Sequence, residues 1–383
     1  MRRTWGRVVG GNRGIVTVDL SGAGAPTIYD VANRAGVSTA TVSRVLNGHA
    51  NLRSTTRQRV VDAMAELNFV PNSAARGLSQ GLKKVVGIVF AGAPATDQLD
   101  SVEEETLLFT DAVVRGAEAG ASHHGYSLLL NSIGTSRGSA GEIVAGLTGK
   151  VDGLVLLDRV LPERRVAALT RRIPVVLLAG SGRSRSAVTV RVDNTAAMAD
   201  VARHLVGGHG FRRLAFVSGL AASPDSASRA ASFVAAANEL GAEVEPLEEW
   251  AGDWTSGGAV RVTRARLEGG GRVPEAIACA NDQTALGVMY ALHRAGHRVP
   301  EDVAVVGFDD IPVARHLSPP LTTVRQPSRA LGTAAIEALI TLVEERSSNG
   351  GDIVLPTELQ IRGSCGCPTD TFPSLSDAWR MEV

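Results

Sequence analysis

From residue 85 onward, short apolar runs alternate with stretches that have the periodicity of helices. The apolar runs lack regular polar positions, which is typical of strands that are buried on both faces. Helices between such strands imply right-handed crossovers, so the pattern predicts a parallel, doubly wound α/β fold. The expected strands are Val85–Phe90, Tyr126–Leu130, Leu154–Leu157, Val175–Ala179, Val188–Val192, Leu214–Val217, Ile277–Ala280 and Val303–Phe308. The expected helices include Asp111–His124, Thr195–Gly207, Ser226–Leu240, Gln283–Ala295 and Arg329–Glu345.

These units are too numerous for one compact sheet. The segment Gly180–Ser186 (Gly-Ser-Gly-Arg-Ser-Arg-Ser) is typical of a flexible connector between two lobes. The later segment Ser318–Pro327 contains consecutive prolines, which favour an extended chain and forbid a helix. We therefore expect two lobes that are joined by extended crossing segments.

Three short amphipathic helical runs precede this body. Thr27 and Asp30 have the spacing of a capping box, and Gly36 is suited to end the first helix. Ser38 is a candidate N-cap of the second helix, and a third helix is expected to begin near Ser54–Thr56. The short turn between the first two helices is that of a helix-turn-helix motif. The side chains expected to face inward are Ile28, Val31, Ala32, Ala35, Val42, Val45, Leu46, Val60, Val61, Met64 and Leu67.

The second helix has an unusual outer face. Its exposed positions are expected to be Thr39, Ala40, Thr41, Ser43 and Arg44. These side chains are small or hydroxylated, and the one guanidinium can donate several hydrogen bonds. Such a helix fits into a DNA major groove and reaches both bases and phosphates. A generic three-helix subdomain with a polar face is the alternative interpretation.

The charge of the chain is zero overall but unevenly distributed. Between residues 27 and 84, eight basic residues stand against three acidic ones, so the remainder is net acidic. Any contact with nucleic acid is therefore expected in this front part of the chain. The signal is modest, because many solvated helices are basic.

The order Val37-Ser38-x-x-Thr41-Val42-Ser43-Arg44-Val45-Leu46-Asn47-Gly48 favours the DNA interpretation. The run Thr27-Ile28-x-Asp30-Val31-Ala32 precedes it, and Pro71-Asn72-x-x-Ala75-Arg76-x-Leu78 follows. Together these motifs resemble the lactose- and galactose-repressor family of bacterial transcription regulators. The resemblance implies a small all-α helix-turn-helix head plus an α/β, two-lobed, periplasmic-binding-protein-like core made of two Rossmann-like doubly wound subdomains.

The resemblance also implies a homodimer on double-stranded operator DNA that is nearly palindromic, because two-fold protein symmetry requires matching DNA symmetry. Thr39 and Ala40 are the expected base contacts, and Thr41, Ser43 and Arg44 are expected to contact phosphates or adjacent bases. The other residues expected to contact DNA are Thr27, Ser38, Asn47, Asn72, Ala75, Arg76 and Leu78.

A hinge is implied at residues 72–78. By resemblance it becomes helical only on operator DNA, where Leu78 wedges into the minor groove and Ala75 packs beside it. Gly77 lowers helix stability by about 1 kcal/mol relative to alanine, which favours a hinge that is disordered away from DNA.

The expected organisation follows from these segments. We expect a disordered N-terminal arm (1–26), a helix-turn-helix DNA-binding domain or reader (27–70), a hinge helix and linker (71–84), a ligand-binding and dimerisation core (85–367) and a tail (368–383). The first lobe is placed at 85–182 and 327–355 and the second at 187–322 and 356–365, with crossings near 180–188, 322–327 and 355–357.

Polar residues at the ends of apolar runs are candidates for ligand binding, because the cleft of such a fold lies at the carboxyl ends of its strands. By resemblance, the effector-binding residues are Arg229, Trp254, Asn281, Asp309 and Gln326. Amides, carboxylates, guanidinium and indole suit the hydroxyls and apolar face of a sugar or sugar derivative. Packing is the alternative role for Trp254. N-capping is an equally expected alternative to ligand binding for Asp282 and Asp310, so Asn281 and Asp309 are the better ligand candidates.

The sequence contains no phosphate loop, nucleophile elbow or zinc-protease motif, so no enzyme and no cofactor are expected. The eight histidines show no metal-like grouping. Cys365 and Cys367 are too close in sequence for a usual zinc pair and have no nearby partner set, so no metal is expected. A membrane span is not expected. Residues 1–26 lack the apolar core of an export signal, which favours a cytoplasmic location.

The expected function is a ligand-responsive, sequence-specific transcription regulator, foremost a repressor. Ligand closure of the two lobes would reorient the paired hinges and release the operator, although a corepressor would have the opposite effect. A sugar-binding uptake protein with the same core is one alternative, but it has no use for a DNA reader. A sugar-acting enzyme such as a kinase is another, which the missing phosphate loop disfavours.

Overall fold

The computed structural model describes residues 26–46, 52–69, 82–91, 107–133, 137–157, 160–180, 182, 184, 186–270, 272–345 and 350–368 of the 383. The chain divides into two compact units, residues 1–76 and residues 77–383. No helix in these ranges is both long enough and apolar enough to span a membrane.

The first unit contains α1 (Ile28–Ala35), α2 (Thr39–Leu46) and α3 (Ser54–Glu66). The capping box is confirmed, since the Thr27 hydroxyl accepts from Asp30 N–H and the Asp30 carboxylate accepts from Thr27 N–H. Gly36 ends α1 in the left-handed conformation, with φ 61°. The buried core of the unit consists of Val31, Ala32, Ala35, Val42, Val60 and Ala63.

One inward-facing prediction for this unit is wrong. The side chain of Val61 is 46% exposed, whereas Val60 is fully buried. Successive residues of an α-helix point about 100° apart, so α3 can turn only one of these two valines to the core. The apolar face of α3 is therefore narrower than the sequence pattern indicated.

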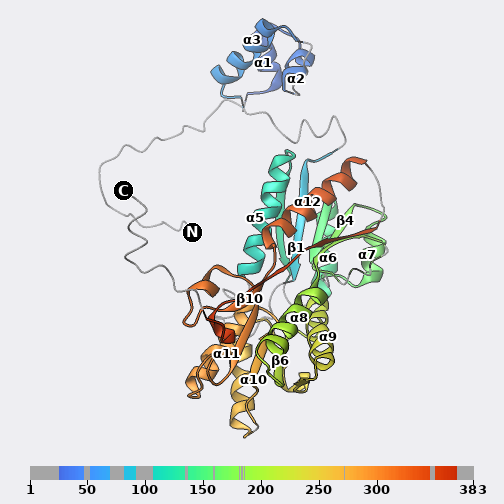
Figure 1. Cartoon of the computed structure of the whole chain (residues 1–383). Coiled ribbons are helices and arrows are strands. Elements are labelled where there is room, and N and C mark those ends of the chain that lie inside the picture. The colour runs from blue at the N-terminus through green and yellow to red at the C-terminus, as the bar shows by residue number, and fades with distance from the viewer. Residues whose placement is uncertain are drawn as a thin grey trace, which may run out of the picture. The chain divides into compact units, whose positions relative to one another are not determined.

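The second unit contains two six-stranded sheets with helices around them (Figure 1). The first sheet has the order β11-β5-β4-β3-β1-β2, and every neighbouring pair is parallel. Its strands are β1 (Val85–Ala91), β2 (Ser127–Ile133), β3 (Gly153–Leu157), β4 (Val175–Leu178), β5 (Val188–Val192) and β11 (Gly351–Leu355). Its helices are α5 (Leu107–His123), α6 (Arg137–Thr148), α7 (Glu163–Leu169) and α12 (Ser328–Glu345).

Helices α5 and α12 lie side by side, although about two hundred residues separate them in the sequence (Figure 1). A Cβ atom on Gly116 would lie 1.8 Å from the carbonyl oxygen of Arg329, and one on Gly332 would lie 2.0 Å from that of Val113. Glycine is therefore required at both positions, because the two backbones approach too closely for any side chain. This packing fixes the late helix α12 to the first sheet.

The second sheet has the order β12-β10-β9-β8-β6-β7, and only β12 runs antiparallel to its neighbour. Its strands are β6 (Arg213–Val217), β7 (Glu243–Val244), β8 (Ala276–Cys279), β9 (Ala304–Asp309), β10 (Thr322–Arg325) and β12 (Glu358–Gln360). Its helical segments are α8 (Asn194–Ala202), the π-helix η1 (Arg203–Gly208), α9 (Pro224–Glu239), η2 (Leu247–Trp250), α10 (Ser256–Glu268), α11 (Asp282–Arg294), η3 (Pro312–His316) and η4 (Gly363–Cys365).

The first crossing between the sheets differs from the prediction. Strand β5 pairs with β4 and β11, so it belongs to the first sheet and not to the second. The chain therefore crosses only after Val192, not at 180–188. The glycine- and serine-rich segment at 180–186 connects two neighbouring strands of one sheet, and its composition alone did not distinguish a strand connection from a crossing between lobes.

Candidate functional site

Helix α2 presents the side chains that the sequence predicts to read DNA. Ser38, Ala40 and Arg44 are exposed, whereas Thr39, Thr41 and Ser43 are half-buried. The Ser38 hydroxyl accepts a hydrogen bond from Thr41 N–H (3.2 Å). The hydroxyls of Ser38 and Thr41 also form a hydrogen bond with each other (3.0 Å). Ser38 is thus the N-cap of α2, as predicted. The outer face of α2 is small and polar, with Arg44 as its cation.

The turn between α1 and α2 is held from α3. The guanidinium of Arg59 donates to the backbone carbonyls of Ala35 and Gly36. An exposed aromatic side chain near the start of α1, Tyr29, is 70% accessible and was not among the residues predicted to contact DNA.

Five of the predicted DNA contacts lie outside the described residues. They are Asn47, Asn72, Ala75, Arg76 and Leu78.

In the second unit, Arg229 lies at the carboxyl end of the second sheet. It comes from α9 and is only 3% exposed. Its Nε donates to Asn194 Oδ1 (2.8 Å) and its Nη1 donates to the Ala280 carbonyl (2.6 Å). The guanidinium carbon lies 3.5 Å from the centre of the Phe308 ring. Burial lowers the pKa of Arg229, and the carboxylates of Asp225, Asp309 and Asp282 oppose this shift.

Asp309 and Gln326 lie beside this arginine. Arg229 Nη1 is 3.9 Å from Asp309 Oδ1, which also accepts from Gln326 Nε2 (2.5 Å). Burial raises the pKa of Asp309 to about 7, despite the opposing effect of Arg229. Asp309 and Asp310 have φ of 119° and 55°, in a region that non-glycine residues seldom adopt. Such strained conformations cluster at binding sites, where the surrounding structure enforces them.

The remaining two candidates, Asn281 and Trp254, are joined to each other. The Asn281 side chain accepts from Thr284 N–H (2.9 Å) and donates to the Trp254 carbonyl (3.1 Å). The half-buried Trp254 ring packs on the Gly219 backbone, where a Cβ atom would lie 2.3 Å from it. The ring centre is 5.7 Å from the Arg229 guanidinium carbon. All five predicted ligand residues thus come from the carboxyl end of one sheet.

The expected capping roles of Asp282 and Asp310 are wrong. Asn281 is the N-cap of α11, and the fully buried Asp282 accepts from Thr323 Oγ1 (2.5 Å) and Ile311 N–H (2.8 Å). Asp310 accepts from Arg325 (2.7 Å) and Arg362 (2.5 Å). Both carboxylates bind residues of β10, and Asp310 also binds Arg362. Helix α11 begins at Asp282, one residue too early for a cap at that position, and Ile311, not Asp310, precedes η3.

A cavity of about 830 Å³ is lined by two of the five candidates, whereas Arg229, Trp254 and Asn281 are not among its lining residues. Asp309 and Gln326 line it together with Phe109 of α5 and Arg329 of α12. It therefore has walls from both sheets' helices and strands, as expected for a ligand held between two lobes. A sugar-sized molecule fits in this volume.

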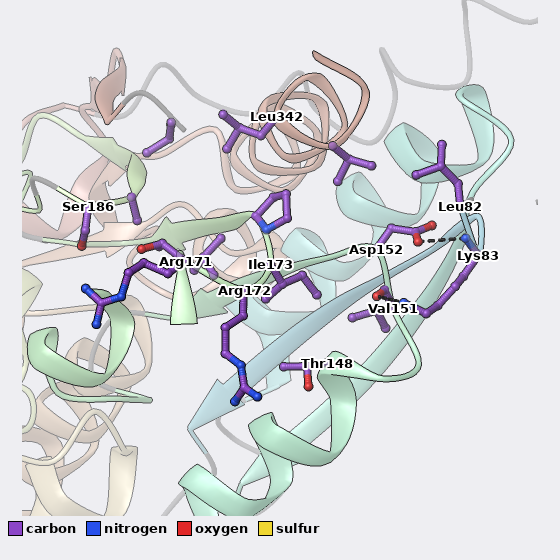
Figure 2. Close-up of a pocket in the computed structure, with 16 residues that line it drawn as sticks. Leu82, Lys83, Thr148, Val151, Asp152, Arg171, Arg172, Ile173, Ser186 and Leu342 are labelled. Atoms are coloured by element: carbon purple, nitrogen blue, oxygen red, sulfur yellow. Dashed lines mark hydrogen bonds between the residues drawn. The ribbon is translucent and has the colours of Figure 1, made fainter. Parts of the chain in front are cut away.

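A second cavity, of about 470 Å³, contains none of the five candidates. Figure 2 shows Lys83 beside Asp152 and Val151 at its edge. The Lys83 N–H donates to the Asp152 carboxylate (2.8 Å), and its ammonium donates to the Val151 carbonyl (2.9 Å). These bonds fix the end of the linker to the first sheet.

The expectation that Cys365 and Cys367 have no partner set is also wrong. His204 and His209 face both cysteines, and the four candidate ligand atoms lie within 4.8 Å of one another. No local sequence pattern indicates this group, because its two halves are more than 150 residues apart.

Comparisons with known proteins agree with this architecture. Residues 27–72 match the model for bacterial regulatory proteins of the lacI family, and residues 202–365 match a periplasmic binding protein-like domain. The chain is 31% identical to the transcriptional repressor PurR of Vibrio parahaemolyticus serotype O3:K6, covering 88% of this chain and 98% of that protein.

Two solved structures are similar over most of their length. The lac repressor dimer bound to operator and the anti-inducer ONPF has a TM-score of 0.76 at 28% identity, covering 89% of this chain and 99% of that one. The complex of the transcriptional regulator CelR with cellobiose has a TM-score of 0.63 at 29% identity, covering 88% and 99%. The sequence, the fold and these similarities together show that the chain belongs to the lacI family of bacterial regulatory proteins.

Proposed function

We propose that this protein is a transcriptional repressor that binds operator DNA through α2 and responds to a sugar-like effector. The observation that carries the proposal is the combination, in one chain, of the small polar outer face of α2 with the buried Arg229 cluster beside a cavity. The first suits a DNA groove, and the second suits a small polar ligand. A ligand-responsive repressor needs both.

The DNA-binding half of the proposal rests on α2. Ala40 at its start presents a methyl group without steric bulk, and Arg44 presents a fork of donors at its end. Thymine methyls and guanine or phosphate oxygens are the matching groups on DNA. The exposed Tyr29 adds a ring and a hydroxyl on the same unit.

The ligand-binding half rests on Arg229, Asp309 and Gln326. Their side chains offer a planar donor, a buried acceptor and an amide, which is a set that can bond neighbouring hydroxyls in both directions. The similar CelR structure holds cellobiose, a polyhydroxylated ligand of the class expected for this site. Trp254 supplies an apolar ring beside the same arginine.

A two-fold dimer is part of the proposal. The similar lac repressor structure is a dimer bound to operator, and a two-fold dimer requires two half-sites of matching symmetry. Each reader would then cover one half-site. A ligand that favours one arrangement of the two lobes would shift the population of dimers that can place both readers on DNA.

The test begins with Arg44→Ala. The operator is first selected from a randomised palindromic duplex library with the wild-type protein. Loss of the Arg44 contacts is expected to weaken operator binding by about 1–3 kcal/mol in a gel-shift titration. Arg34→Ala is the matched control, since Arg34 is an exposed arginine of the same unit that pairs with Glu66 on α3. Equal affinity of Arg44→Ala and wild type would refute the role of α2.

The ligand half is tested on the same complex. A panel of mono- and disaccharides is scored for release or strengthening of bound operator, and any active sugar is repeated with Gln326→Ala. Gln326 contacts Asp309 in the cavity wall, so the variant should require a higher sugar concentration while keeping its operator affinity. A panel without any effect on operator binding would leave DNA binding intact but contradict a sugar effector.

A further inference from the structure

Four soft ligand atoms converge at the amino end of strand β10. They are Nε2 of His204, Nε2 of His209, Sγ of Cys365 and Sγ of Cys367. The two histidines come from η1 and its C-cap, and the two cysteines come from η4 and the residues after it. None of the residues proposed to bind DNA or effector belongs to this group.

Four of the six distances between these atoms are close to the edges of a tetrahedral metal site, and all six lie within 4.8 Å. Zinc–sulfur bonds of about 2.3 Å and zinc–nitrogen bonds of about 2.05 Å imply edges of about 3.3 Å for N–N and about 3.6 Å for N–S pairs. The two histidine Nε2 atoms are 3.3 Å apart. The His204–Cys365, His209–Cys367 and His204–Cys367 pairs are 3.3, 3.3 and 3.8 Å apart.

Two local backbone features orient these side chains toward one another. Residues five apart in an α-helix point about 140° from each other. In η1 the His209 N–H instead donates to the His204 carbonyl (3.2 Å), which is the π-helical bond, so the two imidazoles come onto one side. Gly366, with φ 95°, reverses the chain between the two cysteines so that both sulfurs face the histidines.

Neighbouring groups hold the ligands in place. The Thr322 hydroxyl donates to Cys365 Sγ (3.1 Å), and the His209 ring stacks on Phe211 with centroids 5.3 Å apart. Such supporting contacts are typical of metal sites, where the outer partners orient the ligands.

We propose that His204, His209, Cys365 and Cys367 form a structural zinc site. Two thiolates and two imidazoles in tetrahedral arrangement are the set that zinc takes in closed sites with four protein ligands. Cys365 is fully buried and the other three are half-buried, so the set leaves a path for the ion to enter. A copper(I) or ferrous ion is disfavoured, since two sulfur and two imidazole donors are the set typical of zinc.

The site has a clear structural consequence. Cys365 and Cys367 follow the last crossing of the chain, and η1 lies more than 150 residues earlier. A bound ion joins these two segments and therefore fastens the end of the core beside β10. Because such an ion binds the folded state and not the unfolded chain, its binding free energy adds to the stability of this unit.

The experiment uses the full-length chain with a tag that contains no histidine or cysteine. It is produced in zinc-supplemented medium, desalted, and analysed for metal by mass spectrometry. The expected result is about one zinc per chain, as for a closed four-ligand site. Cys367→Ser and His209→Ala should lose most of this zinc, and Cys279→Ala should keep it, since Cys279 is a buried cysteine of β8 outside the group.

A second measurement, cobalt binding, needs only the wild-type protein. Wild-type protein, stripped by a chelator, is titrated with Co²⁺ and followed by visible absorption. Tetrahedral binding with two thiolates gives intense d–d bands and a sulfur-to-cobalt charge-transfer band, and added Zn²⁺ should abolish both. The melting temperature should rise with Zn²⁺ in wild type and in Cys279→Ala but not in Cys367→Ser.

Several results would overturn the proposal. Wild-type protein without bound zinc and without thiolate-type cobalt bands would exclude the site. Zinc retained in Cys367→Ser would show that the metal lies elsewhere. A disulfide between Cys365 and Cys367 in protein handled under reducing conditions, seen as a mass two units lower, would replace the metal site by a covalent bond.

Discussion

The second sheet carries a polar group at each end of its strands, and the two groups are built in opposite ways. At the carboxyl end, Gln326 after β10 donates to Asp309 beside Arg229, and these charged or polar side chains are almost completely buried. At the amino end, Thr322 of the same strand donates to Cys365 in a group of thiols and imidazoles. One strand thus links both groups.

The two groups differ in how their polar atoms are paired. The Arg229 group satisfies its charges with one another and with backbone carbonyls, and it borders a cavity, so a ligand can enter and leave. The His204 group brings four atoms with lone pairs close together. Hydrogen bonds among these atoms can pair only some of the lone pairs, whereas a single metal cation can bind all four. The first arrangement suits exchange of a ligand, and the second suits a permanently bound ion.

The largest effect is expected for Arg229→Met. Removal of the guanidinium leaves the Asn194 amide oxygen and the Ala280 carbonyl without their donor and takes the cation away from Asp309, which should lower the free energy of unfolding by about 3–5 kcal/mol. Urea denaturation of the second unit measures this loss. Arg261→Met is the control, because Arg261 is 73% exposed in its pair with Asp253 and should cost less than about 1 kcal/mol. Similar losses for both variants would mean that burial does not distinguish the Arg229 group.

A smaller effect is expected from the pH dependence of Asp309. Burial raises its pKa in the folded protein from 3.8 to about 7, so between these values the folded state holds a proton that the unfolded chain has lost. The contribution of Asp309 to stability is therefore fully present below pH 3.8 and decreases as the pH rises, by up to about 1.4 kcal/mol per unit. Above pH 7 it should change no further.

Asp309→Asn provides the comparison for this measurement. The difference in unfolding free energy between wild type and Asp309→Asn should decrease from about pH 4 to about pH 7, since the amide does not titrate. Urea titrations at several pH values give the curve. A constant difference over this range would show that Asp309 is ionised in the folded state, and that the carboxyl end of the sheet is more polar than its burial indicates.

The sequence predicted the carboxyl-end group far better than the amino-end group, for a physical reason. Strand ends can be read from apolar runs, and parallel strands bring their carboxyl ends to one edge, so Asn281 and Asp309 were placed together correctly. His204 and His209 have a spacing that puts them on different faces of an α-helix. Only the π-helical turn of η1 joins them, and no local pattern in the sequence predicted it.

The other predictions also differ in whether they depend on local or distant residues. Asn281 and Asp282 are both good N-caps, and sequence alone cannot decide which one begins α11. Strand β5 was assigned to the wrong sheet because pairing with β11 depends on residues 351–355, far along the chain. The N-cap of α2 was predicted correctly because capping is local, but of the five side chains expected to be exposed on this helix only Ala40 and Arg44 are exposed, since α1 and α3 partly cover the others.

The smallest effect is expected at Asn281, which connects helix capping to the ligand group. Its oxygen caps α11 by accepting from Thr284 N–H, and its amide nitrogen donates to the Trp254 carbonyl. Asn281→Ala loses both bonds and should cost about 1 kcal/mol or slightly more in urea denaturation. Asn281→Asp keeps an oxygen at the cap but has no donor for Trp254, so it separates the two contributions.

If Asn281 serves mainly as a cap, Asn281→Asp should be nearly as stable as wild type, because a carboxylate at a helix N-terminus is favourable. If its bond to Trp254 matters, the same variant should lose stability and quench or shift tryptophan fluorescence, since the strained loop at Trp254 (φ 76°) would lose its anchor. The second outcome would make the loop part of the carboxyl-end group. The first would confine that group to Arg229, Asp309 and Gln326.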